Sequence, residues 1–156
     1  MSEDRGSGVV RRGHESFLIL LVEDNHAHAM LIMRAFERLG FSGKIDWVKD
    51  GRAALDYLHE KVIMGNGILP KLVMLDLRLP KLDGHEVLRE MKRSDRLKII
   101  PVVILTTSTS DEDLRQAYSN HVNSYLTKPL SFDDLQKTVE EIKTYWFELN
   151  QFPKPV

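Results

Sequence analysis

Cysteine is missing from all 156 residues of the chain. Its absence excludes disulfide bonds, catalysis by a thiolate, and zinc or iron–sulfur centres bound by cysteine. Long hydrophobic runs are missing as well, since the longest one, Phe17 to Val22, is far shorter than the roughly 20 residues that a membrane-spanning helix requires. The polar N-terminus has no secretory signal. We therefore predict a cytoplasmic protein with no membrane partner.

An excess of charge of one sign is also absent. The chain has 22 basic and 23 acidic residues and a formal net charge of -1, so it lacks the positive field that favours nucleic acids, and we expect no direct DNA binding. Neither the Gly-x-x-x-x-Gly-Lys-Ser/Thr loop nor the Gly-x-Gly-x-x-Gly fingerprint of nucleotide-binding proteins occurs. What is present is the composition and length of one ordinary globular domain, with 42% hydrophobic and 29% charged residues.

Short apolar runs alternate with amphipathic helical patterns along most of the chain. Runs of this length predict buried strands, and strands that alternate with helices imply βαβ units with right-handed crossovers. The sequence therefore predicts an α/β protein, a doubly wound (βα)5 three-layer sandwich whose five-stranded parallel sheet is covered on both faces. The predicted strands are Phe17 to Val22, Ile45 to Val48, Leu72 to Leu75, Val102 to Leu105 and Tyr125 to Leu126.

The two ends of the chain and one internal segment depart from this pattern. Residues 1–15 have no apolar periodicity and are predicted to be disordered. The domain is expected to span residues 16–147, followed by a tail over residues 148–156. Residues 61–71 contain two glycines and a proline, which predicts a loop longer than this class of fold usually has.

Polar residues follow four of the predicted strands at the point where each strand ends. In an open α/β sheet, ligands bind outside these carboxyl ends, so the side chains should meet at one edge. Two carboxylates 4 Å apart repel by roughly 4 kcal/mol at an effective dielectric constant near 20. A hard divalent cation such as Mg²⁺, together with a lysine, would offset that repulsion. The residues concerned are Glu23 and Asp24, Asp76, Thr106, and the pair Lys128 and Pro129.

Asp76 follows the middle strand and is the candidate nucleophile. A carboxylate beside a divalent metal and an ammonium group is suited to attack an anionic phosphoryl group, because both cations screen its charge. Taken alone, each residue has an ordinary explanation, since Asp24 or Asn25 could cap the following helix. Asp83 could likewise cap a helix that begins near Gly84. The coincidence of such features at the ends of four buried strands favours the functional interpretation.

Together these motifs resemble the receiver domain of two-component response regulators over about residues 17–147. The resemblance implies a flavodoxin-like sheet with strand order 2-1-3-4-5. It also implies a phosphorelay protein that accepts a phosphoryl group from a histidine kinase and signals through protein–protein contacts, without being an enzyme. The segments that carry the resemblance are LVEDN (21–25), LDLRLPKLDG (75–84), PVVILT (101–106) and YLTKP (125–129).

The resemblance also implies roles for individual residues in metal binding. Mg²⁺ is expected to bind the carboxylates of Glu23, Asp24 and Asp76. The backbone carbonyl of Arg78 is expected to be a further ligand.

A second set of roles concerns the phosphoryl group on Asp76. The Thr106 hydroxyl is expected to hydrogen-bond it, and the Lys128 ammonium to pair with it. Thr106 and Tyr125 would form the switch, the hydroxyl drawn toward the phosphoryl group and the ring turning inward. The peptide bond between Lys128 and Pro129 is expected to be cis by analogy, although only about 5% of X–Pro bonds are.

Within the family, residues 61–71 and the aromatic C-terminal end resemble the small single-domain regulators that serve phytochrome-type sensor histidine kinases. This implies a phytochrome-type kinase as partner and a homodimer formed through the last helix, the fifth strand and the tail. The alternative is that Trp146 and Phe147 cover the core of the domain itself. The residues expected at the dimer interface are Tyr145, Trp146, Phe147 and Phe152.

Two other functions stay open. An aspartyl-phosphate phosphatase would carry an Asp-x-Asp pair after the first strand, where this chain has Glu23 and Asp24. A receiver-like scaffold that is never phosphorylated would not need every chemical position of the site. His26 and His28 lie two positions apart on a helix and point in different directions, so we interpret them as surface residues near the site entrance.

Overall fold

The computed structural model describes residues 17–64 and 68–153. Five strands form one parallel sheet in the order β2-β1-β3-β4-β5, which confirms the predicted fold class and strand order. The strands are β1 (Leu18–Val22), β2 (Lys44–Val48), β3 (Leu72–Leu75), β4 (Val102–Thr106) and β5 (Ser124–Thr127). The helices are α1 (His26–Arg38), α2 (Gly51–Ile63), α3 (Gly84–Arg93), α4 (Asp111–Ser119), α5 (Phe132–Thr144) and the π-helical turn η1 (Tyr145–Leu149).

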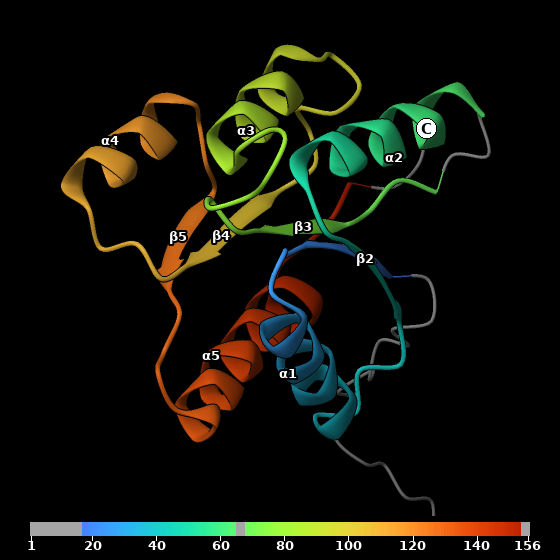
Figure 1. Ribbon diagram of the computed structural model, residues 1–156. Helices are drawn as coiled ribbons and strands as arrows, with labels where there is room; N and C mark the ends of the chain where they lie inside the picture. The colour runs from blue at the N-terminus through green and yellow to red at the C-terminus, as the bar shows by residue number, and fades with distance from the viewer. Residues whose placement is uncertain (1–16, 65–67, 154–156) are drawn as a thin grey trace, which may run out of the picture.

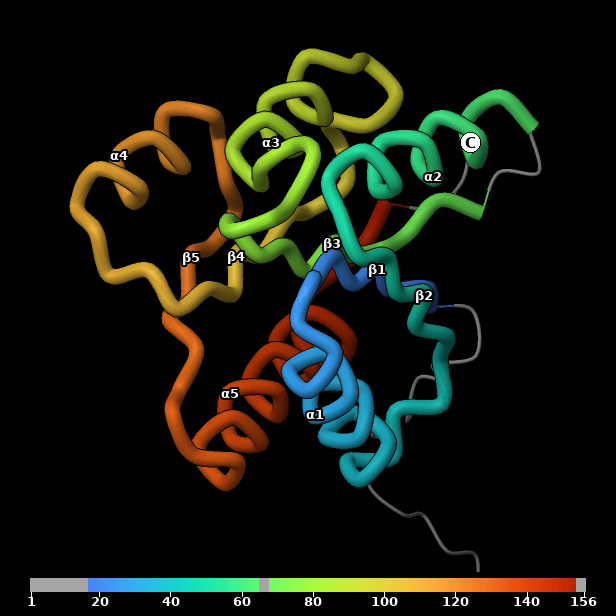
Figure 2. Tube along the Cα trace, in the orientation of Figure 1, coloured from blue at the N-terminus to red at the C-terminus, as the bar shows by residue number. Residues whose placement is uncertain are grey.

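The helices cover both faces of the sheet. Figure 1 shows α1 and α5 on one face and α2, α3 and α4 on the other, and the Cα trace in Figure 2 shows the same three layers. Every residue of the central strands β1, β3 and β4 is buried, as expected for parallel strands that are covered on both sides. The edge strands β2 and β5 are partly exposed.

Alternate residues of each strand point to opposite faces of the sheet and form two hydrophobic cores. In β1, Leu20 and Val22 belong to the core beneath α2 and α3, whereas Ile19 and Leu21 belong to the core beneath α1 and α5. The second core includes Phe147 of η1, which is completely buried. The aromatic C-terminal region is therefore part of the domain.

A polar side chain caps the start of each α-helix. The Asn25 Oδ1 accepts a hydrogen bond from the His28 N–H at 3.0 Å at the start of α1. At α3, Asp83 accepts from the Glu86 N–H at 3.0 Å, which confirms the predicted cap. Because Asn25 caps α1, the Asp24 carboxylate is left for another role. The caps of α2, α4 and α5 are Asp50, Ser110 and Ser131.

α2 extends further than the sequence pattern predicts. The helix continues to Ile63, because Val62 still packs against the hydrophobic core. The predicted loop over residues 61–71 therefore begins only at Met64, and its residues 65–67 lie outside the described residues.

Ordered structure also continues past residue 147, the predicted C-terminal end of the domain. Helical structure continues through η1 to Leu149, and the Phe152 ring packs against Phe147 at 6.2 Å between centroids. The described part of the predicted tail thus contributes to the core. Residues 1–15, predicted to be disordered, lie outside the described residues. Among the helices that the structure describes, none is long and apolar enough to cross a membrane.

Candidate functional site

Two acids leave neighbouring strands side by side at the carboxyl edge of the sheet. Val22 of β1 pairs with Leu75 of β3. The next residues, Glu23 and Asp76, therefore leave the sheet at the same level. The Asp76 N–H donates to the carbonyl of Val22 at 3.0 Å, and the Glu23 N–H donates to the carbonyl of Val48 at 3.1 Å. These backbone bonds extend the sheet by one residue and fix both acids.

Glu23, Asp24 and Asp76 form a cluster of carboxylates, as the sequence predicts. One carboxylate oxygen from each residue lies within 4.8 Å of the other two. Glu23 and Asp76 are buried, at 1% and 7% exposure, whereas Asp24 is exposed. Three oxygen ligands at this spacing, with one side open to solvent, fit a hard divalent cation that keeps several water molecules in its coordination shell.

Lys128 brings the predicted positive charge into this cluster. It lies just beyond β5, and its N–H donates to the carbonyl of Thr106 at 2.7 Å, so the backbone of β4 positions it. Its Nζ donates to Glu23 Oε2 at 2.5 Å and to Asp76 Oδ2 at 2.8 Å. The Lys128 side chain is 5% exposed, and its ammonium group lies between two buried carboxylates.

The cluster retains an excess of negative charge. The pKa of Glu23 is raised to about 7, mainly by burial and also by the charge of Asp76, against the lowering effect of the hydrogen bond from Lys128. Two buried carboxylates share one ammonium group, so a second cation would stabilise their ionised forms. The acids present therefore fit a Mg²⁺ ion by donor type, spacing and charge.

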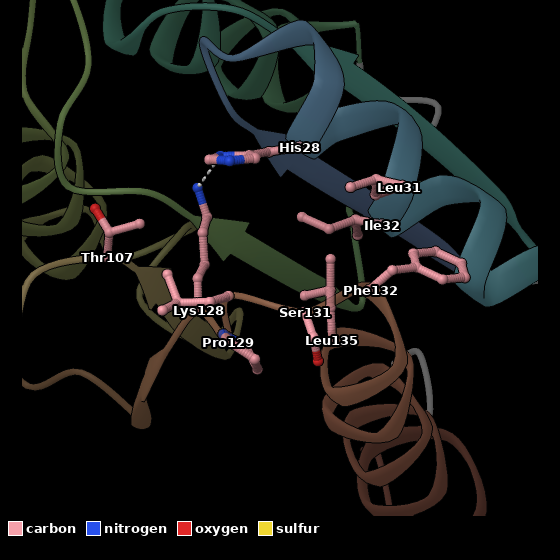
Figure 3. A pocket seen from close by; sticks show the side chains of 10 residues that line it. His28, Leu31, Ile32, Thr107, Lys128, Pro129, Ser131, Phe132 and Leu135 are labelled. Carbon is pink, nitrogen blue, oxygen red and sulfur yellow. Dashed lines mark hydrogen bonds between the residues drawn. The ribbon is translucent and has the colours of Figure 1, made fainter.

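A groove leads from the surface to Lys128. Figure 3 shows His28 and Lys128 pointing toward one another across the end of the groove, between α1 and the start of α5. The Lys128 Nζ donates to His28 Nδ1 at 3.2 Å, so the imidazole accepts through that nitrogen. The groove has a volume of about 140 Å³. Its other lining residues are Leu31, Ile32, Thr107, Pro129, Leu130, Ser131, Phe132 and Leu135.

The sequence predicts His28 near the entrance of the site, and it lies there. The sequence predictions do not include its contact with Lys128. The signal for it is present in the sequence, because a side chain in the first turn of a helix points back toward the N-terminus, here toward Asp24 and Glu23. Its Nδ1 lies 3.9 Å from Glu23 Oε1.

The end of β3 meets the start of α3 at a very close approach. A Cβ atom on Gly84 would lie 2.2 Å from the backbone oxygen of Asp76, closer than any side chain permits. Glycine therefore lets α3 begin directly against the strand end that carries Asp76, and the Gly84 N–H donates to the carbonyl of Leu77 at 3.0 Å.

Both predicted switch residues contact the same residue, Ser108. Thr106 is completely buried, and its Oγ1 accepts from the Ser108 N–H at 3.3 Å. The Tyr125 hydroxyl donates to the Ser108 carbonyl at 3.1 Å, and its ring is partly buried. Because Leu75 pairs with Ile104, Thr106 leaves β4 one residue beyond the level of Asp76. Nothing in the sequence singled out Ser108.

Two further contacts fix the loops around the acids. The Arg78 N–H donates to Asp76 Oδ1 at 3.4 Å, which places the predicted ligand Arg78 on the loop beside the carboxylate. The Trp47 indole N–H donates to the backbone carbonyl of Glu23 at 2.7 Å. Trp47 comes from β2, 24 residues away in the chain, and no local pattern indicates this contact.

Two expectations require correction. The Lys128–Pro129 peptide bond is trans, not cis, which is the lower-energy isomer of most X–Pro bonds. Phe147 is 0% exposed, so it has no surface to offer a dimer interface and instead fills the core, as the alternative interpretation proposed. Tyr145 is 52% exposed, and Trp146 and Phe152 are partly buried.

Comparison with known proteins agrees with this geometry. The family model described as the response regulator receiver domain matches residues 19–140. The chain belongs to this family. It is 67% identical over 99% of its length to the probable methanogenesis regulatory protein FilR2 of Methanothrix harundinacea, with 99% of that relative covered. It is 41% identical to the response regulator Rcp1 of Synechocystis, over 87% of this chain and 92% of the relative.

Solved structures show the same fold. The crystal structure of the phosphorylated cyanobacterial phytochrome response regulator RcpA has a TM-score of 0.82 and 39% identity, and the match covers 88% of this chain and 99% of that one. The Mn²⁺-bound form of Rcp1 has a TM-score of 0.81 and 40% identity, with 88% and 99% covered. The receiver fold and the relation to single-domain phytochrome response regulators are therefore established, and these relatives are signalling regulators.

Proposed function

We propose that the chain accepts a phosphoryl group on Asp76 from a phosphohistidine in a sensor kinase. The observation that carries the proposal is the position of the Asp76 carboxylate: Oδ2 receives a hydrogen bond from Lys128 at 2.8 Å, and the other two acids lie within 4.8 Å. This is the environment that a carboxylate nucleophile needs in order to approach an anionic phosphoryl group. Transfer from a kinase that uses ATP would take place in the cytoplasm, the location that we propose.

The chemical step requires little from the protein beyond position and charge. An Asp76 oxygen forms a bond to phosphorus while the bond from phosphorus to the imidazole nitrogen of the donor breaks, and the electron pair of that bond stays on the imidazole. The carboxylates of Glu23, Asp24 and Asp76 and the carbonyl of Arg78 would hold Mg²⁺, which when bound would supply positive charge to the phosphoryl oxygens. The groove beside Lys128 gives the donor a route to the acceptor.

Residues of this chain then hold the product. The Lys128 ammonium pairs with a phosphoryl oxygen. The Thr106 hydroxyl donates to another, since its oxygen at present accepts from Ser108 and its own hydrogen can turn toward the new group. A shift of Thr106 moves Ser108, whose carbonyl accepts the hydrogen bond from the Tyr125 hydroxyl. This movement changes the surface around α4 and β5. We propose that this surface signals through a downstream protein.

The relatives suggest two kinds of input. RcpA is a phytochrome response regulator, which supports a phytochrome-type kinase as the partner and light as the signal. The relative at 67% identity is instead named as a methanogenesis regulatory protein, which favours a kinase that controls metabolism. Phosphotransfer from each histidine kinase of the source organism, measured at short times, would distinguish the two.

We also propose that the chain forms a homodimer through the end of α5, β5 and the aromatic residues Tyr145, Trp146 and Phe152. Tyr145 supports this, because its large ring is 52% exposed and stacks edge-on against Trp146 at 5.0 Å. Phe152 is partly buried and packs against the same core as Trp146. Light scattering at several protein concentrations tests the pairing.

The substitution Asp76→Asn tests the phosphoryl acceptor. With Mg²⁺ and a small phosphodonor such as phosphoramidate, the natural chain should take up about one phosphoryl group and release it slowly, and Asp76→Asn should fall to background. Asp83→Asn is the matched control: it removes a carboxylate from the same loop but keeps the α3 cap, because Asn and Asp cap equally well.

Other outcomes would favour the rival functions. Rapid turnover of phosphoesters would indicate an aspartyl-phosphate phosphatase. Absence of labelling in the natural chain would indicate a scaffold that is not phosphorylated. Equal labelling of the natural chain and Asp76→Asn would contradict the assignment of Asp76.

A further inference from the structure

α4 is attached to the rest of the domain in an unusual way. Its buried residues are Asp113 and Ala117. The larger apolar side chains of the helix, Leu114 and Tyr118, are 39% and 55% exposed. The side chains that the helix buries fully are therefore one methyl group and one carboxylate. An acid buried in the first turn of a helix requires partners, since an unpaired buried charge is strongly destabilising.

The Asp113 carboxylate has three partners from three other segments. Oδ2 accepts from Arg78 Nη2 at 2.8 Å and from Ser108 Oγ at 2.5 Å. Oδ1 accepts from His85 Nε2 at 2.9 Å. The hydrogen bonds from Ser108 and His85, and the charge of Arg78, hold the pKa of Asp113 below its usual value. The carboxylate thus joins α4 to α3 and to the loops after β3 and β4.

His85 depends on this contact. Its side chain is 7% exposed, and Nδ1 has no hydrogen-bond partner in the described part of the chain. Because a carboxylate only accepts, Nε2 must carry the proton in the bond to Asp113. The buried imidazole therefore makes one hydrogen bond through Nε2. That bond links His85 of α3 to Asp113 of α4.

Two of these three partners, Arg78 and Ser108, lead to the phosphoryl-acceptor site. The Arg78 N–H donates to Asp76 Oδ1, while its guanidinium group binds Asp113. The Ser108 N–H donates to Thr106, its carbonyl accepts from Tyr125, and its hydroxyl binds Asp113. The Asp113 carboxylate is thus joined by one hydrogen bond to each of the two loops that border the site, the loop after β3 through Arg78 and the loop after β4 through Ser108.

We propose that Asp113 is a positioning residue that latches α4 to these two loops and is released when a phosphoryl group occupies Asp76. The proposal rests on the proposed function. A phosphoryl group carries about two negative charges and takes the place of the single charge of the Asp76 carboxylate. The added charge attracts the Arg78 guanidinium away from Asp113, and the phosphoryl group draws Thr106 away from Ser108. Both changes weaken the contacts of the same carboxylate, so α4 loosens as the site fills.

Hydrogen–deuterium exchange of α4 in the full chain tests the latch. Asp113→Asn should speed the exchange of the α4 amides at least tenfold without any ligand. The matched control is Asp111→Asn, an exposed acid in the same first turn, which loses the same favourable interaction with the helix dipole and should exchange like the natural chain. Equal exchange in the two variants would overturn the latch.

Beryllium fluoride with MgCl₂, a phosphoryl mimic, tests the release. It should speed α4 exchange in the natural chain and in Asp111→Asn, and have little further effect in Asp113→Asn. Failure of the mimic to bind the natural chain would refute the proposed function and with it the release. Binding of the mimic with an undiminished response in Asp113→Asn would refute the release alone.

The affinity for Mg²⁺ distinguishes a positioning role of Asp113 from a role that only stabilises the fold. In Asp113→Asn the released Arg78 guanidinium can move toward the acids and compete with the cation, so the Kd for Mg²⁺ should rise about three- to tenfold. In an Arg78→Ala background the same substitution should raise the Kd much less, because no guanidinium is left to move. An equal rise in both backgrounds would mean that Asp113 acts by stabilising the fold, and would overturn its positioning role.

Discussion

The two helices that flank β5 in sequence, α4 and α5, are held by different forces. α5 buries Leu135, Val139 and Ile142, and the turn that follows buries Phe147 among other aromatic rings. α4 buries one alanine and one carboxylate. Apolar packing at interior density has one good arrangement, whereas hydrogen bonds and ion pairs can exchange partners at similar energy. The difference suggests that α5 anchors the domain and that α4 is the element free to respond.

Magnitudes support this division. Burial of one Leu, Ile or Phe side chain stabilises a fold by about 1.5–3 kcal/mol, so the buried residues of α5 and η1 together contribute several kcal/mol. A hydrogen bond contributes a net of about 0.5–1.5 kcal/mol, and for Asp113 the cost of burying its charge must be subtracted. Elements with few buried apolar contacts open first in the native state, so α4 should open before α5.

The largest expected effect on stability comes from η1, on the face of the sheet that α1 and α5 cover. Phe147→Ala should lower the free energy of unfolding by about 3–5 kcal/mol, because a fully buried ring is replaced by a cavity. Tyr145→Ala, in the same turn but half exposed, should cost less than about 1 kcal/mol. Urea unfolding measures both. A loss below about 1 kcal/mol for Phe147→Ala would contradict the anchoring role of η1 and would indicate that Phe147 is exposed.

The sheet and its acidic edge could be predicted because their signals are local. An apolar run marks each buried strand, and the polar residue after it must lie at the carboxyl edge, as Glu23 and Asp76 do. The latch could not be predicted in this way. Asp113 has the sequence pattern of an ordinary acid in the first turn of a helix, and its partners His85 and Arg78 lie 28 and 35 residues away in the chain.

The sequence pattern misleads where tertiary contacts decide the outcome. It places the start of the loop after α2 too early, because Val62 packs on the core despite the turn residues that follow it. It also favours an interface role for Phe147, because aromatic residues near a chain end resemble an exposed patch. Its burial depends on rings from distant segments, Phe17 at 5.0 Å and Phe41 at 5.2 Å.

An intermediate effect on stability and on Mg²⁺ affinity is expected at Trp47, which connects the acid cluster to the core beneath α1 and α5. The indole packs with the core beneath α1 and α5 and donates to the Glu23 carbonyl. Trp47→Phe keeps most of the packing but removes the donor, so it should cost about 1 kcal/mol of stability and raise the Kd for Mg²⁺ about two- to fivefold. Calorimetric titration with MgCl₂ measures the Kd, and Trp146→Phe is the control. An unchanged Kd in Trp47→Phe would show that the strand register alone fixes Glu23.

The smallest effect is expected on α4, and it gives the sharpest comparison because the same chemical change can be made on both helices. Leu114→Ala on α4 removes a side chain that is 39% exposed, so it should change the free energy of unfolding by no more than about 0.5 kcal/mol. Leu135→Ala on α5 removes one that is 5% exposed and should cost about 2–5 kcal/mol. The midpoints of urea unfolding, compared between variants whose free energies of unfolding have the same dependence on urea concentration, measure the difference in stability. If the two substitutions cost the same, α4 is packed as firmly as α5, and a polar latch is not what holds it.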